Sequence, residues 1–171
     1  ASAVDRALPQ LRAAALVEMA RRSAAMPDTA RFSRPLFTVI LGDRSFRDVC
    51  ELANGTVMCW GDNGYGQLGD ASTYDRSTPV AVQDLSGVVA LCAGRYHTCA
   101  LTREGRVWCW GRNDFGQLGN GGHYDSASPL QVPGINGVTA LSADCYHSGA
   151  VLPDGSVWCW GRNDYGQLGN D

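Results

Sequence analysis

The same block of residues returns every 50 positions along this chain. Each copy contains the tripeptide Cys-Trp-Gly and, a few residues later, Gly-Gln-Leu-Gly. The copies stand at 59–61 with 66–69, at 109–111 with 116–119, and at 159–161 with 166–169. A fixed period of this size is typical of repeat proteins, in which each unit buries its apolar faces against its neighbours. Residues present in every unit are therefore expected to serve the unit, while residues that vary are better candidates for binding.

The middle unit contains four short apolar segments separated by turn-forming residues. These segments are 88–91, 96–102, 106–110 and 130–132. Four strands in one 50-residue unit predict a blade of a β-propeller. Within the third segment, Val107 and Cys109 alternate with two tryptophans, so both faces of that strand are apolar. This is the pattern expected of a blade that is sandwiched between two other blades.

Applied to the whole chain, the period predicts an all-β fold with two blades and most of a third. The units span about 38–87, 88–137 and 138–171, and the third unit ends before a fourth strand. Residues 1–35 differ in composition and are predicted to form a separate helical or linker segment, with a short helix from Pro9 to about Arg22. A closed ring needs typically ~4–8 blades. We therefore expect further blades outside this chain, or self-association of several copies.

The charge distribution excludes several classes of partner. The net charge is −3, and it divides into eight basic and five acidic residues in 1–48 and six basic and twelve acidic residues in 49–171. An acidic repeat region is a poor match for nucleic acid or for an anionic membrane surface. No apolar run approaches the ~20 residues that a membrane helix needs. We expect neither nucleic-acid binding nor membrane insertion.

Two cysteines of the middle unit are predicted to form a disulfide. The segment 103–105 ends in glycine and fits a three-residue hairpin loop. Centring the hairpin there puts Cys99 opposite Cys109 in a non-hydrogen-bonded pair. The alpha carbons of such a pair lie about 4.5 Å apart, which is close enough for a disulfide.

The first unit repeats this relation with a different turn. Its hairpin is one residue shorter, with Asn54 and Gly55 at the tip, and the cysteine has moved with the register, so that Cys50 faces Cys59. A second disulfide is predicted there. The alternative for both pairs is free buried thiols that pack as small hydrophobes.

The third unit breaks the rule. Gly149 stands opposite Cys159, and Cys145 lies four residues away, roughly 13 Å along a strand, which is too far to replace the missing partner. Together with Cys92 these cysteines are left without an assigned role, and the odd total of seven requires at least one free or intermolecular thiol.

No catalytic, cofactor or metal site is predicted. His97 and His147 each precede a strand without an accompanying nucleophile motif, so structural histidines are favoured. A zinc site formed by His97, Cys99 and Cys109 is a weaker alternative, because the spacing matches no known zinc motif. The aspartate-containing loops lack the alternating acids of a calcium loop.

Comparison of the units with one another indicates where a partner could bind. Tyr-Asp recurs at 74–75 and 124–125, and proline recurs at 79 and 129, so these residues are interpreted as architectural. The positions that differ between units lie in loops, where specificity usually resides. The candidate partner-binding residues are Thr73, Arg76, Arg95, His123 and Ser126.

The segments 96–101, 107–113 and 116–119 resemble the regulator of chromosome condensation repeat, also found in alpha-tubulin-suppressor-like proteins. The resemblance covers about residues 38–171 and implies a propeller of the seven-bladed type with about 50 residues in each blade. The cysteine-bearing form is similar to the one in exported bacterial proteins. The chain departs from the repeat at Asp48, where the other units have histidine, and at Asp144, where Gly94 is the equivalent residue.

The founding member of that family is a nuclear exchange factor for a small GTPase, which depends on an inserted wedge and on chromatin. No insertion is visible in any unit here. The sequence therefore predicts a non-enzymatic protein-binding scaffold of an exported or surface bacterial protein, with an extracellular location. Guanine-nucleotide exchange on a small GTPase is the alternative that the resemblance implies, and a hydrolytic enzyme has almost no support in the residues.

Overall fold

A computed structural model describes residues 48–53 and 55–170, the first six of them by their backbone alone. The predicted N-terminal segment 1–35 with its helix, and the first ten residues of the predicted first unit, lie outside this range. The described chain contains strands only, and none of it forms a helix that could cross a membrane. The strands are β1 (Asp48–Ala53), β2 (Thr56–Gly61), β3 (Arg76–Ala81), β4 (Val88–Ala93), β5 (His97–Thr102), β6 (Val107–Gly111), β7 (Ser126–Gln131), β8 (Ala140–Asp144), β9 (His147–Val151) and β10 (Val157–Gly161).

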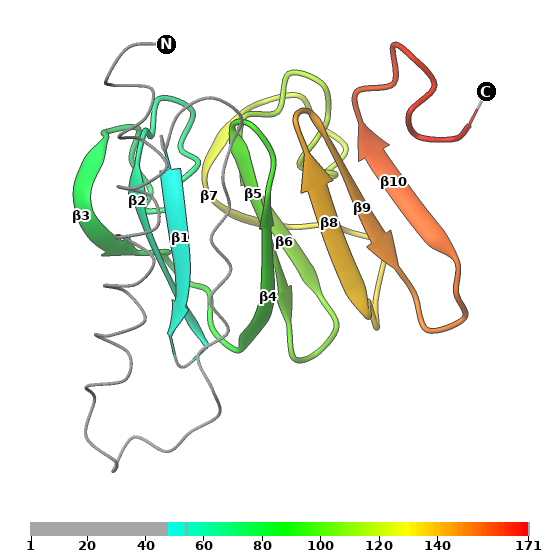
Figure 1. Cartoon of the computed structure of the whole chain (residues 1–171), viewed down its shortest axis with the longest axis horizontal. Coiled ribbons are helices and arrows are strands. Elements are labelled where there is room, and N and C mark those ends of the chain that lie inside the picture. Colours follow the sequence, from blue (N-terminus) through cyan, green and yellow to red (C-terminus); the bar gives the residue numbers. More distant parts are fainter. Residues whose placement is uncertain (1–47, 54, 171) are drawn as a thin grey trace, which may run out of the picture. The chain divides into compact units, whose positions relative to one another are not determined.

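The strands form three antiparallel sheets that follow one another along the chain (Figure 1). The middle sheet has the order β4-β5-β6-β7 and is a complete four-stranded blade. The first sheet has the order β1-β2-β3, and the third has the order β10-β9-β8. Each sheet packs on the next, as the blades of a propeller do. The predicted partial propeller, with two blades and most of a third, is confirmed.

The fourth strand of the middle blade starts earlier than the sequence predicted. The sequence predicts this strand at 130–132, but β7 runs from Ser126 to Gln131. Ser126, the first residue of β7, pairs with Gly111 after a register shift between Cys109 and Gly111. This irregularity lets the strand begin before residue 130. The residues 126–129 are small or polar and include a proline, which gave no strand signal. The boundary prediction was therefore wrong.

Both predicted hairpin registers are correct. Gly105 closes the loop of the middle blade with a φ of +72°, and Gly55 has a φ of +78° in the shorter turn of the first blade. The ladders accordingly place Cys99 opposite Cys109 and Cys50 opposite Cys59. The turn of the first blade is one residue shorter than that of the second, yet in both blades the two cysteines of the hairpin lie opposite each other.

The middle blade contains the predicted disulfide between Cys99 and Cys109, with alpha carbons 4.1 Å apart. Cys92 also lies opposite Cys99, from the other side. Because Cys99 and Cys109 form a non-hydrogen-bonded pair, Cys99 and Cys92 fall in the wider, hydrogen-bonded kind of pair. Burial also raises the pKa of the Cys92 thiol to about 12, so Cys92 has little thiolate with which to exchange. The side chain of Cys50 lies outside the described part, and the first disulfide stays a prediction.

The two faces of the middle blade pack into two separate cores, as the alternation along β6 predicted. Trp110 points toward the first blade, whereas Val107 and Cys109 point toward the third. The core between the first and second blades contains Val57, Cys59, Leu68, Val82, Leu85, Val88, Leu91, Ala100 and Trp110. The core between the second and third blades contains Cys99, Leu101, Val107, Cys109, Leu118, Val132, Ile135, Val138 and Ala150.

A repeated pair of hydrogen bonds joins each blade to the next. The backbone carbonyl of Gln67 accepts one bond from the Trp110 indole at 2.9 Å and one from the Thr98 hydroxyl at 3.0 Å. The carbonyl of Gln117 accepts the same two kinds of bond, from Trp160 at 2.9 Å and Ser148 at 3.2 Å. We call this arrangement the carbonyl clamp. It explains why tryptophan recurs at a 50-residue period. The glutamine recurs for another reason, because its side-chain oxygen accepts the backbone amide two residues earlier, as Gln67 does from Tyr65 at 3.0 Å and Gln117 from Phe115 at 2.9 Å.

The last glycine of each Gly-Gln-Leu-Gly segment gives the tryptophan of the next blade room to reach this clamp. A side chain on Gly69 would place its Cβ 2.8 Å from the Trp110 indole nitrogen, and at Gly119 the corresponding distance to Trp160 is 2.7 Å. Such approaches are closer than carbon and nitrogen atoms tolerate. The segment is therefore a packing motif and needs no ligand to explain it.

Candidate protein-binding surfaces

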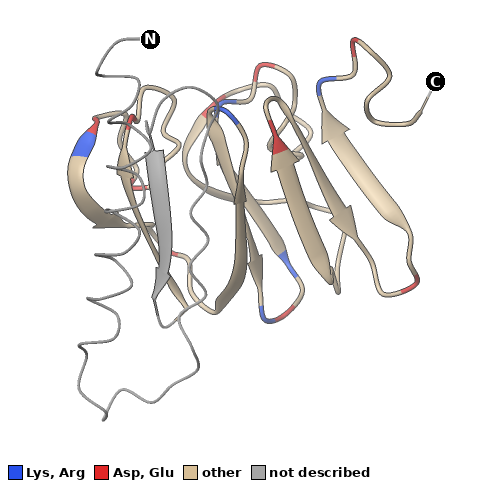
Figure 2. Ribbon diagram, viewed as in Figure 1, with Lys and Arg blue, Asp and Glu red and all other residues tan. Residues whose placement is uncertain are grey.

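The loops that vary between units gather at one end of the sheets, which we call the loop end. It comprises residues 62–75, 94–96, 112–125, 145–146 and 162–170. The β4–β5 and β6–β7 connections share this end because β5 begins where β6 finishes, with His97 opposite Gly111. In Figure 1 the loop end lies at the top of the sheets, and Figure 2 shows charges of both signs there.

A buried asparagine holds each of the first two long loops in shape. The Asn113 side chain donates to Asn120 Oδ1 at 3.1 Å and to the Gly122 carbonyl at 3.0 Å, and it accepts a bond from the Leu118 amide at 2.9 Å. The backbone amide of Asn113 donates to Asp125 Oδ1 at 2.7 Å. Four fixed contacts from one buried residue make this loop a rigid platform.

The first blade repeats the arrangement around Asn63. Its side chain donates to Asp70 Oδ1 at 3.1 Å and to the Tyr74 carbonyl at 3.1 Å, and its amide donates to Asp75 Oδ1 at 2.8 Å. Asp70 also forms an ion pair with Arg76 at 2.7 Å. The aspartates of the two Tyr-Asp pairs are architectural, as the sequence comparison indicated.

The tyrosine side chains of the same pairs are placed differently from the aspartates. The side chains of Tyr74 and Tyr124 are 74% and 89% exposed, so they do not pack in the blade. The interpretation that grouped each tyrosine with its aspartate is wrong for the tyrosines. Two large aromatic rings on rigid loops are the anchors that protein interfaces favour. In the sequence, an aromatic residue in a loop segment without apolar neighbours would have indicated that these side chains are exposed.

Three of the candidate residues from the sequence lie in the loop end, and the other two, Arg76 and Ser126, are the first residues of β3 and β7 directly after it. Thr73 and His123 are exposed and stand directly before the two tyrosines, and Arg95 is exposed in the β4–β5 turn. Arg76 and Ser126 take part in local structure, because Arg76 pairs with Asp70 and the Ser126 hydroxyl donates to the Ser128 carbonyl at 2.7 Å. The binding roles of the five residues stay predictions.

An alternation of arginine and aromatic side chains crosses the loop end from blade to blade. The Arg112 guanidinium lies 4.8 Å from the ring centre of Tyr65, which in turn packs against the Tyr96 ring in a tilted arrangement, with ring centres 5.0 Å apart. One blade further, Arg162 lies 5.0 Å from Phe115. We call the set the arginine–aromatic row, and its members are Tyr65, Tyr96, Arg112, Phe115, Tyr146, Arg162 and Tyr165. Such contacts stabilise neighbouring blades against each other.

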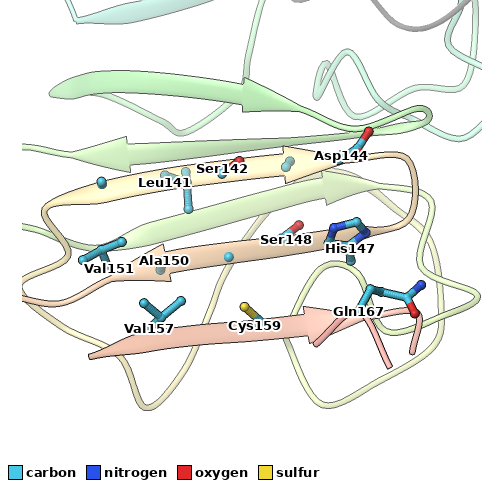
Figure 3. A pocket seen from close by; sticks show the side chains of 13 residues that line it. Leu141, Ser142, Asp144, His147, Ser148, Ala150, Val151, Val157, Cys159 and Gln167 are labelled. Carbon is cyan, nitrogen blue, oxygen red and sulfur yellow. The ribbon is translucent and has the colours of Figure 1, made fainter. Parts of the chain in front are cut away.

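The second surface is the open face of the third blade, drawn in Figure 3. Val157 is 64% exposed there, whereas its equivalent Val107 is fully buried against the third blade. Cys159 and Gln167 are exposed in the same way. With His147 they line a depression of about 280 Å³. In the second blade the equivalent positions serve blade packing, so this face has the chemistry of a blade interface.

The two histidines that the sequence treated as equivalent have different environments. His97 is fully buried, and its Nε2 lies 2.8 Å from the Ser148 hydroxyl. Its ring occupies space that only a glycine leaves open, because a Cβ on Gly94 would lie 2.1 Å from His97 Cε1. In the third blade Asp144 replaces that glycine, and His147 is only half-buried.

The zinc alternative is wrong, because both sulfurs of Cys99 and Cys109 are consumed in the disulfide. Within the residues that the structure describes, no group of three or more potential ligand side chains is arranged to hold a metal ion. The third-unit cysteines are separate, as expected. Cys159 lies opposite Gly149, and Cys145 lies in the turn before β9, where its carbonyl accepts the Arg95 amide at 3.0 Å.

Stacked antiparallel blades, one of four strands and two of three among the described residues, joined by a repeated clamp, define a β-propeller repeat protein. The regulator of chromosome condensation (RCC1) repeat matches residues 54–101 and 104–151, and a second form of the same repeat matches 88–117 and 146–167. The chain belongs to the RCC1 repeat family.

Solved structures of similar fold agree with this assignment. Human WBSCR16 is 30% identical with a TM-score of 0.64, and the match covers 72% of this chain and 33% of that one. Prp20p from Saccharomyces cerevisiae, described with its binding properties to Gsp1p and histones, is 25% identical with a TM-score of 0.60 over 81% of this chain and 34% of that chain.

Among curated proteins, the probable E3 ubiquitin-protein ligase HERC4 of Homo sapiens is 41% identical over 54 residues, or 30% of this chain. The matched segment is 5% of the length of that protein. The likeness is therefore one of repeat units.

Proposed function

We propose that this chain is a non-enzymatic protein-binding module that recognises its partner at the loop end. The observation that carries the proposal is the pair of exposed tyrosines, Tyr74 and Tyr124, on loops fixed by buried asparagines. Tyrosine offers a large contact area with few rotatable bonds, so little conformational entropy is lost on binding. A rigid platform lowers this cost further.

The surroundings of the tyrosines suit a mixed polar and aromatic interface. Thr73 and His123 offer hydrogen-bonding groups next to the rings. Arg95 stands over the Tyr96 ring at 5.3 Å, and within the described chain no carboxylate forms an ion pair with it. An arginine of this kind is available to a carboxylate of the partner. These features support a protein partner with acidic and apolar side chains in its binding segment.

Removing both rings is expected to abolish most binding without harming the fold. Binding peptides are first selected from a displayed library on the immobilised parent chain. Their affinity for the Tyr74→Ser/Tyr124→Ser variant should be at least about tenfold lower than for the parent. Affinity is measured by titration, and the thermal midpoint should stay that of the parent chain because both side chains are exposed. The matched control is Arg103→Ser/Glu104→Ser, at the opposite end of the sheets. Ligands that bind the tyrosine variant undiminished would contradict the proposal.

The open face of the third blade supports a second kind of protein contact, with another blade. The carbonyl clamp indicates which kind of blade would fit this face. The Gln67 and Gln117 carbonyls each accept two hydrogen bonds from the next blade, whereas the Gln167 carbonyl accepts neither of these bonds from the described residues. The first blade of a second copy would supply the tryptophan of the clamp, Trp60. It could not supply the hydroxyl, because Val49 has the ladder position that Thr98 and Ser148 have in the second and third blades. A blade with serine or threonine at that position fits better than self-association through the first blade.

We further propose that the protein is exported or displayed at a cell surface. The Cys99–Cys109 disulfide supports this, because such bonds persist in oxidising compartments. A bacterial origin of the exported type rests on the resemblance of the cysteine-bearing repeat alone. Recovery of the oxidised pair from source cells lysed in a thiol-blocking reagent would support export, and a reduced pair would count against it.

Regulation of a small GTPase is the second candidate, favoured by the likeness to Prp20p. The chain corresponds to about a third of that protein, and the loop end as described holds no inserted wedge. We expect no acceleration of nucleotide release when the chain is mixed with a panel of small GTPases loaded with a fluorescent guanine nucleotide. Release faster than the intrinsic rate would favour exchange activity over the scaffold role.

A further inference from the structure

The second blade has a polar depression at the end of its sheet opposite the loop end. The depression has a volume of about 300 Å³ and lies between the β5–β6 turn and the connection from β3 to β4. Described blades lie on both sides of it, and Figure 2 shows charges of both signs at the β5–β6 turn. The lining residues are Asp84, Leu85, Ser86, Thr102, Glu104, Arg106 and Trp108.

Several polar side chains of the depression have no partner in the part of the chain that the structure describes. There, neither Asp84 nor Arg106 takes part in an ion pair or a side-chain hydrogen bond. The indole N–H of Trp108 has no acceptor among the described residues either, whereas those of Trp110 and Trp160 each donate to a backbone carbonyl. Donors, an acceptor and charges of both signs therefore border one small space without satisfying one another.

Two of the lining residues are unfavourable for the fold itself. The Thr102 side chain is 4% exposed, and its hydroxyl forms no regular hydrogen bond within the described structure, although it lowers the pKa of the nearby Glu104 carboxyl. Asp84 has a φ of +52°, a backbone conformation that suits glycine. A buried hydroxyl without a regular bond and a strained aspartate both reduce stability. The third blade avoids both, because the residues 50 positions later are Leu152 and Gly134.

The apolar part of the depression recurs in the third blade, whereas the polar part does not. Leu85 and Trp108 have apolar equivalents in Ile135 and Trp158, but Arg106 is replaced by a serine. Residues that recur serve the packing of the unit, and residues that vary between units are the better candidates for binding. The polar residues of this depression are therefore not required by the blade.

We propose that this depression binds a single sugar ring. A pyranose presents C–H groups on one face, which pack against the indole of Trp108, and hydroxyls that both donate and accept around its rim. The Asp84 carboxylate accepts from ring hydroxyls, and the Arg106 guanidinium donates to them. Because unpaired charges of both signs border the site, a neutral ligand with both kinds of group satisfies them together. A volume of about 300 Å³ is at the small end of ligand pockets, which suits one ring.

Titration of the whole chain with methyl glycosides of glucose, galactose, mannose and N-acetylglucosamine tests the proposal. At least one glycoside should shift the indole N–H resonance of Trp108 saturably in a nitrogen-15 spectrum. Its affinity should be at least about tenfold lower for the Asp84→Gly/Arg106→Ser variant, which loses the charged hydrogen bonds. This variant carries the residues of the third blade and should unfold no more easily than the parent. Arg103→Ser, in the same turn but outside the depression, is the matched control and should keep the affinity.

A trisaccharide that ends in the same ring is titrated in parallel. Tighter binding than that of the methyl glycoside would identify a glycan as the source of the ring, and equal binding a free sugar; both support the proposal. Absence of a saturable shift with every glycoside, a shift at Trp158 alone, or an equal loss of affinity in Arg103→Ser would each overturn it. Saturable binding of methylammonium without binding of any glycoside would assign the depression to a cationic side chain of a protein and likewise overturn it.

Discussion

The Gly149→Cys variant is expected to form a disulfide with Cys159 and to unfold with a free energy about 2–3 kcal/mol above that of the parent chain. Gly149 has the ladder position that Cys99 has in the second blade, where the alpha carbons of the bonded pair are 4.1 Å apart. A Cβ at position 149 would lie 3.5 Å from the Cys159 sulfur. This contact is ordinary in length, so the side chain enters without a clash.

Denaturant unfolding measures the gain, and alkylation followed by mass spectrometry checks the bond. The gain should vanish in a reducing agent strong enough to open the new bond. Gly149→Ser is the matched control, because it adds a similar side chain without a sulfur. Oxidised Gly149→Cys protein in which Cys159 still alkylates would show that the third blade departs from the geometry of the second.

Sequence reasoning predicted the repeated module well because its signals are local. The turn at Gly105 and the shorter turn at Gly55 set their own registers, and the cysteine positions follow from them. The alternation of valine and cysteine with tryptophan along β6 separates two cores, as expected for a strand with two apolar faces. Each inference needed only neighbouring residues and the known geometry of a hairpin.

The candidate site was harder to predict because it depends on contacts between blades and on exposure. The carbonyl clamp joins Gln67 to a tryptophan 43 residues away, and no local pattern contains that pairing. The exposure of Tyr74 and Tyr124 was hidden for a related reason. Their aspartate neighbours are fixed to buried asparagines, so the recurrence of the pair reflects the aspartate, and only the structure separates the two side chains.

The difference between His97 and His147 likewise arises across a blade boundary. His97 is buried because the third blade covers it and because Gly94 leaves room for its ring. Its Nδ1 has no hydrogen-bond partner within the described structure. Burial, with a smaller contribution from the charge of His147, lowers the pKa of His97 from 6.5 to about 4. The fold therefore keeps this imidazole neutral.

Acidification is accordingly expected to destabilise the chain between pH 6.5 and pH 4 by about 3 kcal/mol through His97 alone. The unfolded chain binds a proton at His97 below pH 6.5, while the folded chain resists it until about pH 4. Across that window the unfolded state holds more protons, so the free energy of unfolding falls as the pH falls. Above pH 6.5 both states are neutral at this residue, and the contribution is constant.

Denaturant unfolding at several pH values measures this slope. The His97→Asn variant should be less stable at neutral pH, because it leaves a void and alters the bond to Ser148, but its stability should fall less between pH 6.5 and pH 4. His123→Asn, in an exposed loop, is the matched control and should keep the slope of the parent chain. Equal slopes for His97→Asn and the parent would mean that the buried imidazole accepts a proton in the folded state, and that the interface between the second and third blades is more open to water than its packing indicates.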